Sequence, residues 1–260
     1  MQEIHNKSSR RLDGKVAIIT GASSGIGAVA GRLFAREGAA VVLAARREAE
    51  LDDLAEEISA SGGKALAVRT DVADAKSVEA LVKRTVDSFG RLDIAFNNAG
   101  VESGIKPLIE YSEEEFDRVI AINLKGVFLC MKYEIPKMLA GGGGAIVNNS
   151  STVGLIAWPG LAPYIASKHG MVGLTKTAAL EYAGKGIRVN AIAPSTVRTE
   201  KIAGLIAADP KIEEGMRRAI PLGRIAEMEE VAETVLWLCS DGASFITGVT
   251  LPVDGGQIVP

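Results

Sequence analysis

Cysteine and histidine are scarce in this sequence. Among 260 residues there are two cysteines, Cys130 and Cys239, and two histidines, His5 and His169. Cysteines so few and so far apart indicate neither a disulfide framework nor a zinc cluster, and they favour a reducing compartment. The histidines form no ligand cluster, so we expect no metal site. These absences predict a cytoplasmic protein.

Long apolar runs and an excess of one charge are also absent. Residues 39–45 form one of the longest apolar runs, which is far short of the ~18 residues of a membrane span. The polar N-terminus lacks the hydrophobic segment of a secretory signal. Lys and Arg number 29 against 32 Asp and Glu, a net charge of −3. We therefore expect neither a membrane nor a nucleic acid as partner.

The apolar residues that are present, 47% of the chain, are arranged for an α/β fold. Short apolar runs predict seven strands, at residues 15–20, 40–44, 65–68, 92–96, 145–149, 187–192 and 250–253. Helical patterns alternate with them at residues 26–37, 48–60, 74–89, 112–139 (one long helix or two joined ones), 162–183 and 228–240. Strands this apolar are buried on both faces, which requires a parallel sheet covered by helices on each side.

No break in composition divides the chain. We predict one doubly wound, Rossmann-type domain over residues 13–260, with a mostly parallel seven-stranded sheet, preceded by a flexible segment, residues 1–12. Residues 194–223 are the one irregular region, and glycine and proline interrupt their apolar pattern. This region is predicted to be a lid over a hydrophobic pocket, with a surface helix packed on the sheet as the alternative.

A glycine-rich turn follows the first predicted strand. Residues 20–27 read Thr-Gly-Ala-Ser-Ser-Gly-Ile-Gly, and a helical pattern begins there. Glycines at a strand-to-helix junction let a pyrophosphate approach the main chain and the N–H groups of the helix. The candidate dinucleotide-binding residues are Gly21, Ser23, Ser24, Gly25, Ile26 and the close-packing Gly27. The alternative is a tight turn without a ligand.

The end of the second strand bears on the choice of dinucleotide. An acidic residue here would accept the ribose 2′-OH of NAD(H), but the chain has Arg46 and Arg47, and no carboxylate until Glu48. Guanidinium groups bind phosphate through paired hydrogen bonds. We therefore expect NADP(H) to be favoured, with NAD(H) possible. Alternatively, both arginines begin a solvated helix.

A tyrosine and a lysine with helical spacing are the candidate acid–base pair. Tyr164 and Lys168 share one helix face, and Ser151 ends a predicted strand thirteen residues earlier. A tyrosine needs a neighbouring positive charge to lower its pKa for proton transfer near pH 7, and Lys168 is expected to supply it. Tyr133 and Lys137 repeat the spacing, but no serine precedes them at the same distance.

Taken together, these motifs resemble the short-chain dehydrogenase/reductase family over residues 13–258. The motifs occur in the family's order: residues 20–27, Asp71 with Val72, the Asn-Asn-Ala-Gly of residues 97–100, Ser151 with Tyr164 and Lys168, and residues 189–194. The resemblance implies a catalytic tetrad completed by Asn123. It also implies cofactor contacts from Asp71, Val72, Asn97, Ala99, Gly100, Pro194, Val197 and Thr199.

The resemblance implies hydride transfer between a nicotinamide cofactor and a ketone or secondary alcohol. The predicted substrate pocket comprises Ser151, Val153, Trp158, Tyr164, Thr196, Ile202 and Leu205. The family usually has glycine after Pro194, whereas this chain has Ser195. We expect this side chain to change the shape of the substrate that the site accepts. A catalytically silent dinucleotide-binding sensor is the alternative function, although such a protein would typically lack one of the serine, tyrosine and lysine.

Two helices have more apolar and small residues than one buried face requires. They cover residues 123–139 and 162–183, and examples are Val127, Phe128, Met131, Ala178 and Ala179. We expect a homo-oligomer. The resemblance implies a homotetramer with a second interface at residues 245–259.

Overall fold

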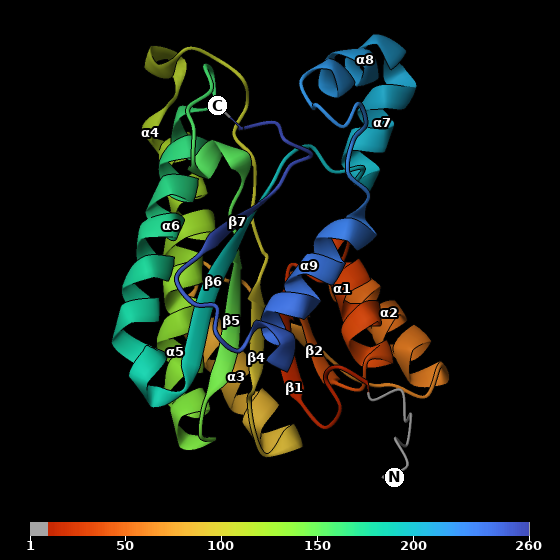
Figure 1. The fold of residues 1–260 in the computed structure, drawn as a ribbon, viewed down its shortest axis with the longest axis vertical. Coiled ribbons are helices and arrows are strands. Elements are labelled where there is room, and N and C mark those ends of the chain that lie inside the picture. Colours follow the sequence, from red (N-terminus) through yellow and green to blue (C-terminus); the bar gives the residue numbers. More distant parts are fainter. Residues whose placement is uncertain (1–9, 260) are drawn as a thin grey trace, which may run out of the picture.

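A seven-stranded, fully parallel sheet forms the centre of the protein, and the predicted doubly wound fold is confirmed (Figure 1). The computed structural model describes residues 10–259. The strand order is β3-β2-β1-β4-β5-β6-β7. The strands are β1 (Val16–Thr20), β2 (Ala40–Ala45), β3 (Lys64–Arg69), β4 (Ile94–Asn97), β5 (Gly144–Asn149), β6 (Ile187–Pro194) and β7 (Thr250–Val253).

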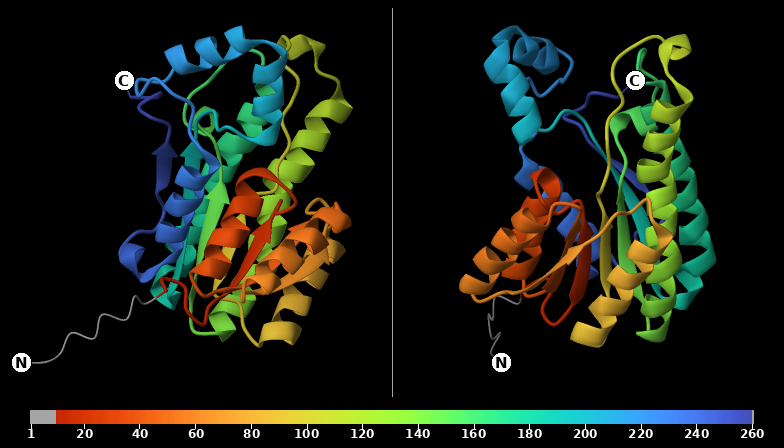
Figure 2. Two further views of the ribbon diagram at one scale, coloured as in Figure 1. Left: turned by 90° about the vertical axis from the view of Figure 1, so that its right-hand side faces the viewer. Right: turned by 180° about the vertical axis from the view of Figure 1, so that it is seen from behind.

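Helices cover both faces of this sheet (Figures 1 and 2). On one face lie α1 (Gly25–Arg36), α2 (Glu48–Ala60) and α9 (Met228–Cys239). On the other lie α3 (Ala75–Phe89), α5 (Gly126–Ala140) and α6 (Ala162–Tyr182). Successive residues of β1 point to opposite faces of the sheet. Ile18 packs in the core beneath α3, α5 and α6, and Ile19 packs in the core beneath α1, α2 and α9. A strand buried on both faces needs the near-continuous apolar sequence seen here.

The strand order reverses between β1 and β4, and this point positions the site. The chain leaves β1 toward β2 and later returns to the other side of β1 as β4, with Ile19 opposite Phe96. The Thr20 hydroxyl accepts hydrogen bonds from the backbone N–H groups of Asn98 and Ala99, both at 3.0 Å. The turns after β1 and β4 are thereby held together at the edge where open α/β sheets bind ligands.

The predicted helical stretch 112–139 consists of two joined helices. Helix α4 (Glu113–Ile120) begins at a capping box between Ser112 and Glu115, and a π-helical turn, Ala121–Lys125, joins it to α5. Of the apolar residues expected to lie at a subunit interface, four are instead buried within the chain: Val127, Met131, Ala178 and Ala179. The fifth of these examples, Phe128, is exposed. The sheet itself uses most of the apolar surface of α5 and α6.

Residues 194–223 are more regular than the sequence pattern indicates. They contain α7 (Glu200–Ala208) and α8 (Pro210–Arg218), which stand beyond the carboxyl ends of the strands (Figure 1). The hydroxyl of Thr199 caps α7, and the carboxylate of Asp209 caps α8. The expectation of an irregular segment is therefore wrong, because Pro210 occupies the first turn of a helix, where proline is tolerated.

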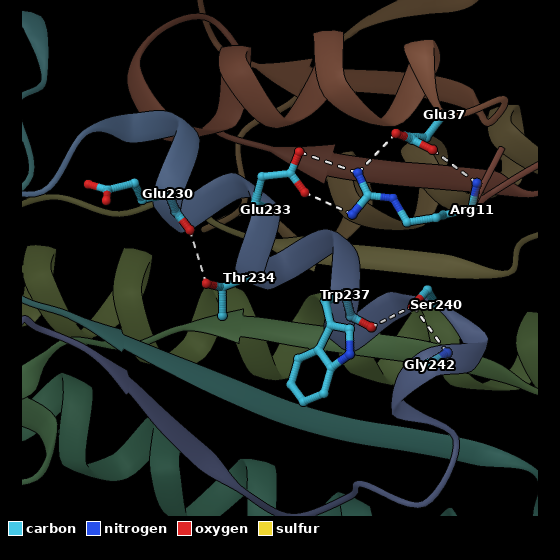
Figure 3. Close-up of polar contacts among 8 residues, drawn as sticks. All are labelled: Arg11, Glu37, Glu230, Glu233, Thr234, Trp237, Ser240 and Gly242. Atoms are coloured by element: carbon cyan, nitrogen blue, oxygen red, sulfur yellow. Dashed lines mark hydrogen bonds and ion pairs between the residues drawn. The ribbon is translucent and has the colours of Figure 1, made fainter. Parts of the chain in front are cut away.

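The described part of the N-terminal segment is packed onto the domain. Leu12 is 1% exposed, and Arg11 pairs with Glu37 at 2.9 Å and with Glu233 of α9 at 2.8 Å (Figure 3). The packed domain thus includes residues before the predicted start at residue 13. The rest of the predicted flexible segment, residues 1–9, lies outside the described residues. No helix within residues 10–259 is both long and apolar enough to cross a lipid bilayer.

Candidate active site

Two adjoining hollows lie at the carboxyl edge of the sheet. The first, the glycine-turn cleft, has a volume of about 430 Å³ and extends from Gly21 to Lys168. The second, the Trp158 pocket, has a volume of about 540 Å³ and lies between the ends of β5 and β6 and the helices α7 and α8. Asn149 and Tyr164 line both hollows, so the phenol stands where they meet.

The glycine turn is shaped so that only glycine fits at two positions. Gly21 has φ +68°, and a Cβ there would lie 2.9 Å from Cα of Ala99. A Cβ on Gly27 would lie 2.4 Å from the carbonyl oxygen of Gly21, which matches its expected role in close packing. Ser24 precedes α1 and makes no side-chain capping bond. This end of α1 suits an anion, because its first N–H groups need acceptors and carry partial positive charge.

Most of the predicted cofactor residues line the glycine-turn cleft. They are Gly21, Ser23, Ser24, Ile26, Arg46, Arg47, Asp71, Val72, Ala99, Gly100, Tyr164, Lys168 and Thr199. Pro194 and Val197 line the Trp158 pocket instead. Gly25 borders a smaller hollow beside the cleft, and Gly27 is buried in the packing of the turn.

Asn97 does not line the cleft, contrary to the expectation from the resemblance. Its side chain is 1% exposed and donates hydrogen bonds at 3.1 Å to Glu134 and to Asn148. Asn148 in turn donates to Thr175 of α6 at 2.9 Å. The first asparagine of the Asn-Asn-Ala-Gly motif thus joins β4 to its neighbours below the site. The second, Asn98, lines the cleft and donates to the Thr20 carbonyl at 3.0 Å.

The two arginines after β2 differ in their contacts. The Arg47 guanidinium donates to the hydroxyls of Ser23 and Ser24 at 3.0 and 2.8 Å and pairs with Glu50 at 2.9 Å. Arg46 makes no side-chain hydrogen bond or ion pair within residues 10–259 and borders the cleft. Arg47 therefore braces the glycine turn, whereas the donors of Arg46 have no partner within the described residues.

Tyr164, Lys168 and Ser151 are brought together as predicted from their spacing. The Lys168 ammonium donates to the Asn149 carbonyl at 2.5 Å and lies 5.4 Å from the centre of the Tyr164 ring. The Ser151 hydroxyl lies 3.5 Å from the Pro194 carbonyl. Tyr164 and Lys168, both from α6, thus lie near Ser151, which follows β5.

Burial moves the pKa values of the tyrosine and the lysine in opposite directions. It raises the pKa of Tyr164 to about 12, aided by the negative charge of Glu102 and opposed by the Ser151 hydroxyl. It lowers the pKa of Lys168 to about 7. The predicted lowering of the tyrosine pKa by Lys168 is not seen, because desolvation disfavours the charged form of each group and the ammonium is bonded to a carbonyl.

Asn123 occupies the π-helical turn and is fully buried. Its side chain makes a two-point contact with the backbone of Val101, accepting from the N–H and donating to the carbonyl, both at 2.8 Å. It also donates to the Ser167 hydroxyl at 3.2 Å. The turn therefore fixes the loop after β4 against α6, next to Lys168 in sequence.

The Trp158 pocket contains most of the predicted substrate residues. Ser151, Val153, Trp158, Tyr164, Thr196 and Ile202 line it. Leu205 does not; it lies about one turn further along α7 than Ile202 and is 42% exposed. Met216 and Ala219, from α8 and just beyond it, complete the apolar wall.

Sequence reasoning missed several polar residues of the site, among them Asn149, Glu102 and Gln257. Asn149 lines both hollows, and its carbonyl binds Lys168. Glu102 lines both and pairs with Lys201 of α7. Gln257 reaches the Trp158 pocket from beyond β7 and accepts from Thr152 at 3.3 Å. Position could have indicated Asn149, since it ends a strand beside Ser151, but no local pattern marks Gln257.

Comparison with known proteins agrees with this geometry. A family model described as enoyl-(acyl carrier protein) reductase matches residues 21–257. The A-factor type gamma-butyrolactone 1′-reductase (1S-forming) of Streptomyces virginiae is 52% identical over 246 residues, 94% of this chain and 96% of the relative. The cyclohexanol dehydrogenase of an Acinetobacter strain is 44% identical, over 95% and 96% of the two chains.

A solved structure shares the whole fold. The 3-ketoacyl-(acyl-carrier-protein) reductase of Brucella melitensis, complexed with NADH, superposes with a TM-score of 0.88 at 38% identity, covering 95% of this chain and all of that one. This chain belongs to the short-chain dehydrogenase/reductase family. It is an oxidoreductase that transfers a hydride between a nicotinamide cofactor and a ketone or secondary alcohol.

Proposed function

We propose that this short-chain dehydrogenase/reductase is an NADP(H)-preferring enzyme in which Tyr164 exchanges the substrate proton. The observation that carries the proposal is the position of the Tyr164 phenol where the glycine-turn cleft meets the Trp158 pocket. A group in the pocket and a cofactor in the cleft both reach this point. With a pKa of about 12, the phenol holds its proton at neutral pH and donates it to a substrate oxygen.

The neighbouring groups support that proton transfer. The Ser151 hydroxyl hydrogen-bonds the substrate oxygen as negative charge develops on it. Lys168, in its charged form, stabilises the phenolate that the transfer leaves and holds the nicotinamide ribose. Asn123 fixes the loop after β4 against α6 at Ser167, so that this geometry is set before the substrate arrives. The cofactor supplies or accepts the hydride when bound.

The residues of the glycine-turn cleft fit a dinucleotide. The glycines and the start of α1, where Ser24 makes no side-chain capping bond, suit its phosphates. Asp71 and Val72 also line the cleft and would hold the adenine. Arg46 borders the cleft and has no protein partner within residues 10–259, which supports recognition of the 2′-phosphate of NADP(H). NAD(H) is the alternative cofactor for this cleft.

The substrate is a small ketone or secondary alcohol with an apolar body. The Trp158 pocket combines an apolar wall with the polar groups around Tyr164, and its volume suits a small molecule. The relatives include a cyclohexanol dehydrogenase and a reductase of gamma-butyrolactones. Helices α7 and α8 form the lid that excludes water from this pocket.

One substitution tests the proposed function. Tyr164→Phe removes the proton donor and keeps the ring, so turnover of NADPH with a panel of ketones, followed at 340 nm, should fall at least about 100-fold. Fluorescence titration should show that NADPH still binds. Tyr133→Phe, at the second tyrosine–lysine pair, should be as active as the wild type. Equal activity of the two variants would contradict the assignment, and wild-type binding of NADPH without any turnover would favour the sensor alternative.

We also propose a cytoplasmic homotetramer. Phe128 on α5 and Leu180 on α6 are 47% and 86% exposed, and Phe245, beyond α9, is fully exposed. Large apolar side chains left in water on two separate surfaces support association through both. Sedimentation should give four times the 27.2 kDa of one chain, and a monomer at micromolar concentration would contradict this proposal.

A further inference from the structure

The hydroxyl of Ser195 is a buried polar group that the proposed mechanism does not use. Ser195 follows the end of β6 and lines the Trp158 pocket. Its hydroxyl oxygen is buried and has no hydrogen-bond partner within the described part of the chain. Its backbone N–H is satisfied by the Val253 carbonyl at 3.2 Å, so the main chain needs nothing from the side chain. A buried hydroxyl without a partner is costly and calls for a ligand group.

The position of Ser195 places this hydroxyl close to the reacting group. Pro194, the preceding residue, presents its carbonyl 3.5 Å from the hydroxyl of Ser151. Ser195 therefore directly follows the residue of β6 that lies beside Ser151, the serine proposed to contact the substrate oxygen. On its other side, β7 supplies the Val253 carbonyl. A ligand atom that bonds to Ser195 would therefore lie on the side of the pocket where Ser151 is placed.

The remaining lining of the pocket is partly polar and partly apolar. Thr152 and Gln257 hydrogen-bond to each other at 3.3 Å on the polar side, near the ends of β5 and β7. Val153 and Trp158 line the pocket from the loop after β5, and Met216 from α8. Such a lining suits a molecule that carries more than one oxygen atom and an apolar remainder.

We infer that the substrate carries a second oxygen close to the reacting carbon, as in a 3-oxo ester or a hydroxyketone, and that the Ser195 hydroxyl hydrogen-bonds to it. This inference rests on the proposed function, because it assigns a partner to a group of the same site. Ser195 acts as a specificity-determining residue: it favours oxygenated ketones over plain ones and takes no part in proton transfer. A plain ketone leaves the hydroxyl unpaired.

A matched pair of ketones tests the inference. Ethyl 3-oxobutanoate carries the second oxygen, and 2-heptanone is a plain ketone of similar length. The wild type should reduce the oxo ester with the higher kcat/KM in the presence of NADPH. In Ser195→Ala this kcat/KM should fall about fivefold to tenfold, the usual effect of one lost hydrogen bond, while that for 2-heptanone should stay within about twofold. Ser195→Gly, which also lacks the hydroxyl, should give the same ratio of the two substrates.

A second unpartnered hydroxyl supplies the control. Thr250 on β7 also has a buried hydroxyl without a partner, but it lines neither the glycine-turn cleft nor the Trp158 pocket. Thr250→Val should leave the ratio of the two kcat/KM values unchanged, so an effect seen in both variants would overturn the inference.

The remaining outcomes separate this inference from the proposed function. An unchanged ratio in Ser195→Ala overturns the inference and leaves the function standing. An equal loss of kcat/KM on both ketones, together with a raised KM for NADPH, also overturns the inference and leaves the function standing. The hydroxyl would then contact the cofactor and not the substrate. A wild-type enzyme that reduces neither ketone with NADPH or NADH contradicts the proposed function itself, and the inference falls with it.

Discussion

At the scale of single residues, the environment of a side chain decides more than its spacing in the sequence. Tyr164 and Lys168 are neighbours because residues four apart share a helix face, and this could be predicted. Their pKa values could not, because they depend on desolvation by residues from distant parts of the chain. The same holds for Asn97, whose motif is recognisable but whose side chain turns into the core toward Glu134.

We expect the choice between NADP(H) and NAD(H) to be set by Arg46, with help from Arg47. Arg46→Asp should weaken NADPH binding by about 10- to 150-fold, because a charge-assisted bond to the 2′-phosphate contributes ~1.5–3 kcal/mol. A carboxylate there also repels the phosphate and accepts the 2′-OH of NADH. Dissociation constants of both cofactors, measured by fluorescence titration, check this expectation.

Two further variants test whether the change in cofactor preference depends on this position. Ala45→Asp places a carboxylate one residue earlier and should shift preference toward NADH in the same direction. Arg69→Asp, at the exposed end of β3, makes the same charge change at a residue that does not line the glycine-turn cleft and should leave the ratio unaltered. If the wild type binds both cofactors equally and Arg46→Asp changes nothing, Arg46 is only a solvated residue before α2.

At the scale of elements, the sequence predicts those buried in the sheet and misreads those outside it. All seven strands could be placed because burial on both faces leaves an unmistakable apolar run. Helices α7 and α8 carry no such constraint, and the glycines and proline within residues 200–218 obscure their helical pattern. The capping residues Thr199 and Asp209 were the available signals.

Helix α7 places a carboxylate at the start of α1. The Gly25 N–H donates to Glu200 at 3.4 Å, in a position where this helix end favours an anion. Glu200 therefore competes with a phosphate for the same partial positive charge. Glu200→Gln should lower the dissociation constant for NADPH about twofold to fivefold, since a charge at a helix end contributes ~0.3–1 kcal/mol. Fluorescence titration at low ionic strength measures this directly.

A neighbouring variant separates charge from movement of the lid. Lys201→Gln breaks the ion pair that joins α7 to Glu102 but leaves Glu200 in place. It should loosen the lid without tightening NADPH. Weaker binding in Glu200→Gln, or equal tightening in both variants, would show that the carboxylate does not compete with the cofactor.

At the scale of the whole molecule, a buried acid links stability to pH. Glu134 on α5 is 1% exposed; one of its oxygens accepts from Asn97, and the other has no partner within residues 10–259. The Asn97 oxygen is also unpartnered. A proton on Glu134 would supply a donor where two acceptors lack one. The sequence does not predict that Glu134 is buried, because the helical pattern of α5 would look the same with this side chain in solvent.

Glu134→Gln should therefore change how stability depends on pH. Burial raises the pKa of Glu134 from 4.5 to about 7, so the folded state holds its proton over an interval in which the unfolded state has lost it. The contribution of this group is fully present below pH 4.5 and is lost as pH rises through 7, to a total of about 3 kcal/mol. Urea unfolding at pH 5 and pH 8.5 should give glutamine and wild-type proteins of similar stability at the lower pH. At the higher pH the glutamine variant should be more stable by about 2–3 kcal/mol.

Comparing the two proteins at each pH cancels the opposite trend from Lys168, whose lowered pKa adds stability above pH 7. Glu56→Gln, on the exposed face of α2, should show no such divergence. A constant difference between wild type and Glu134→Gln at both pH values would mean that Glu134 is ionised in the folded protein throughout.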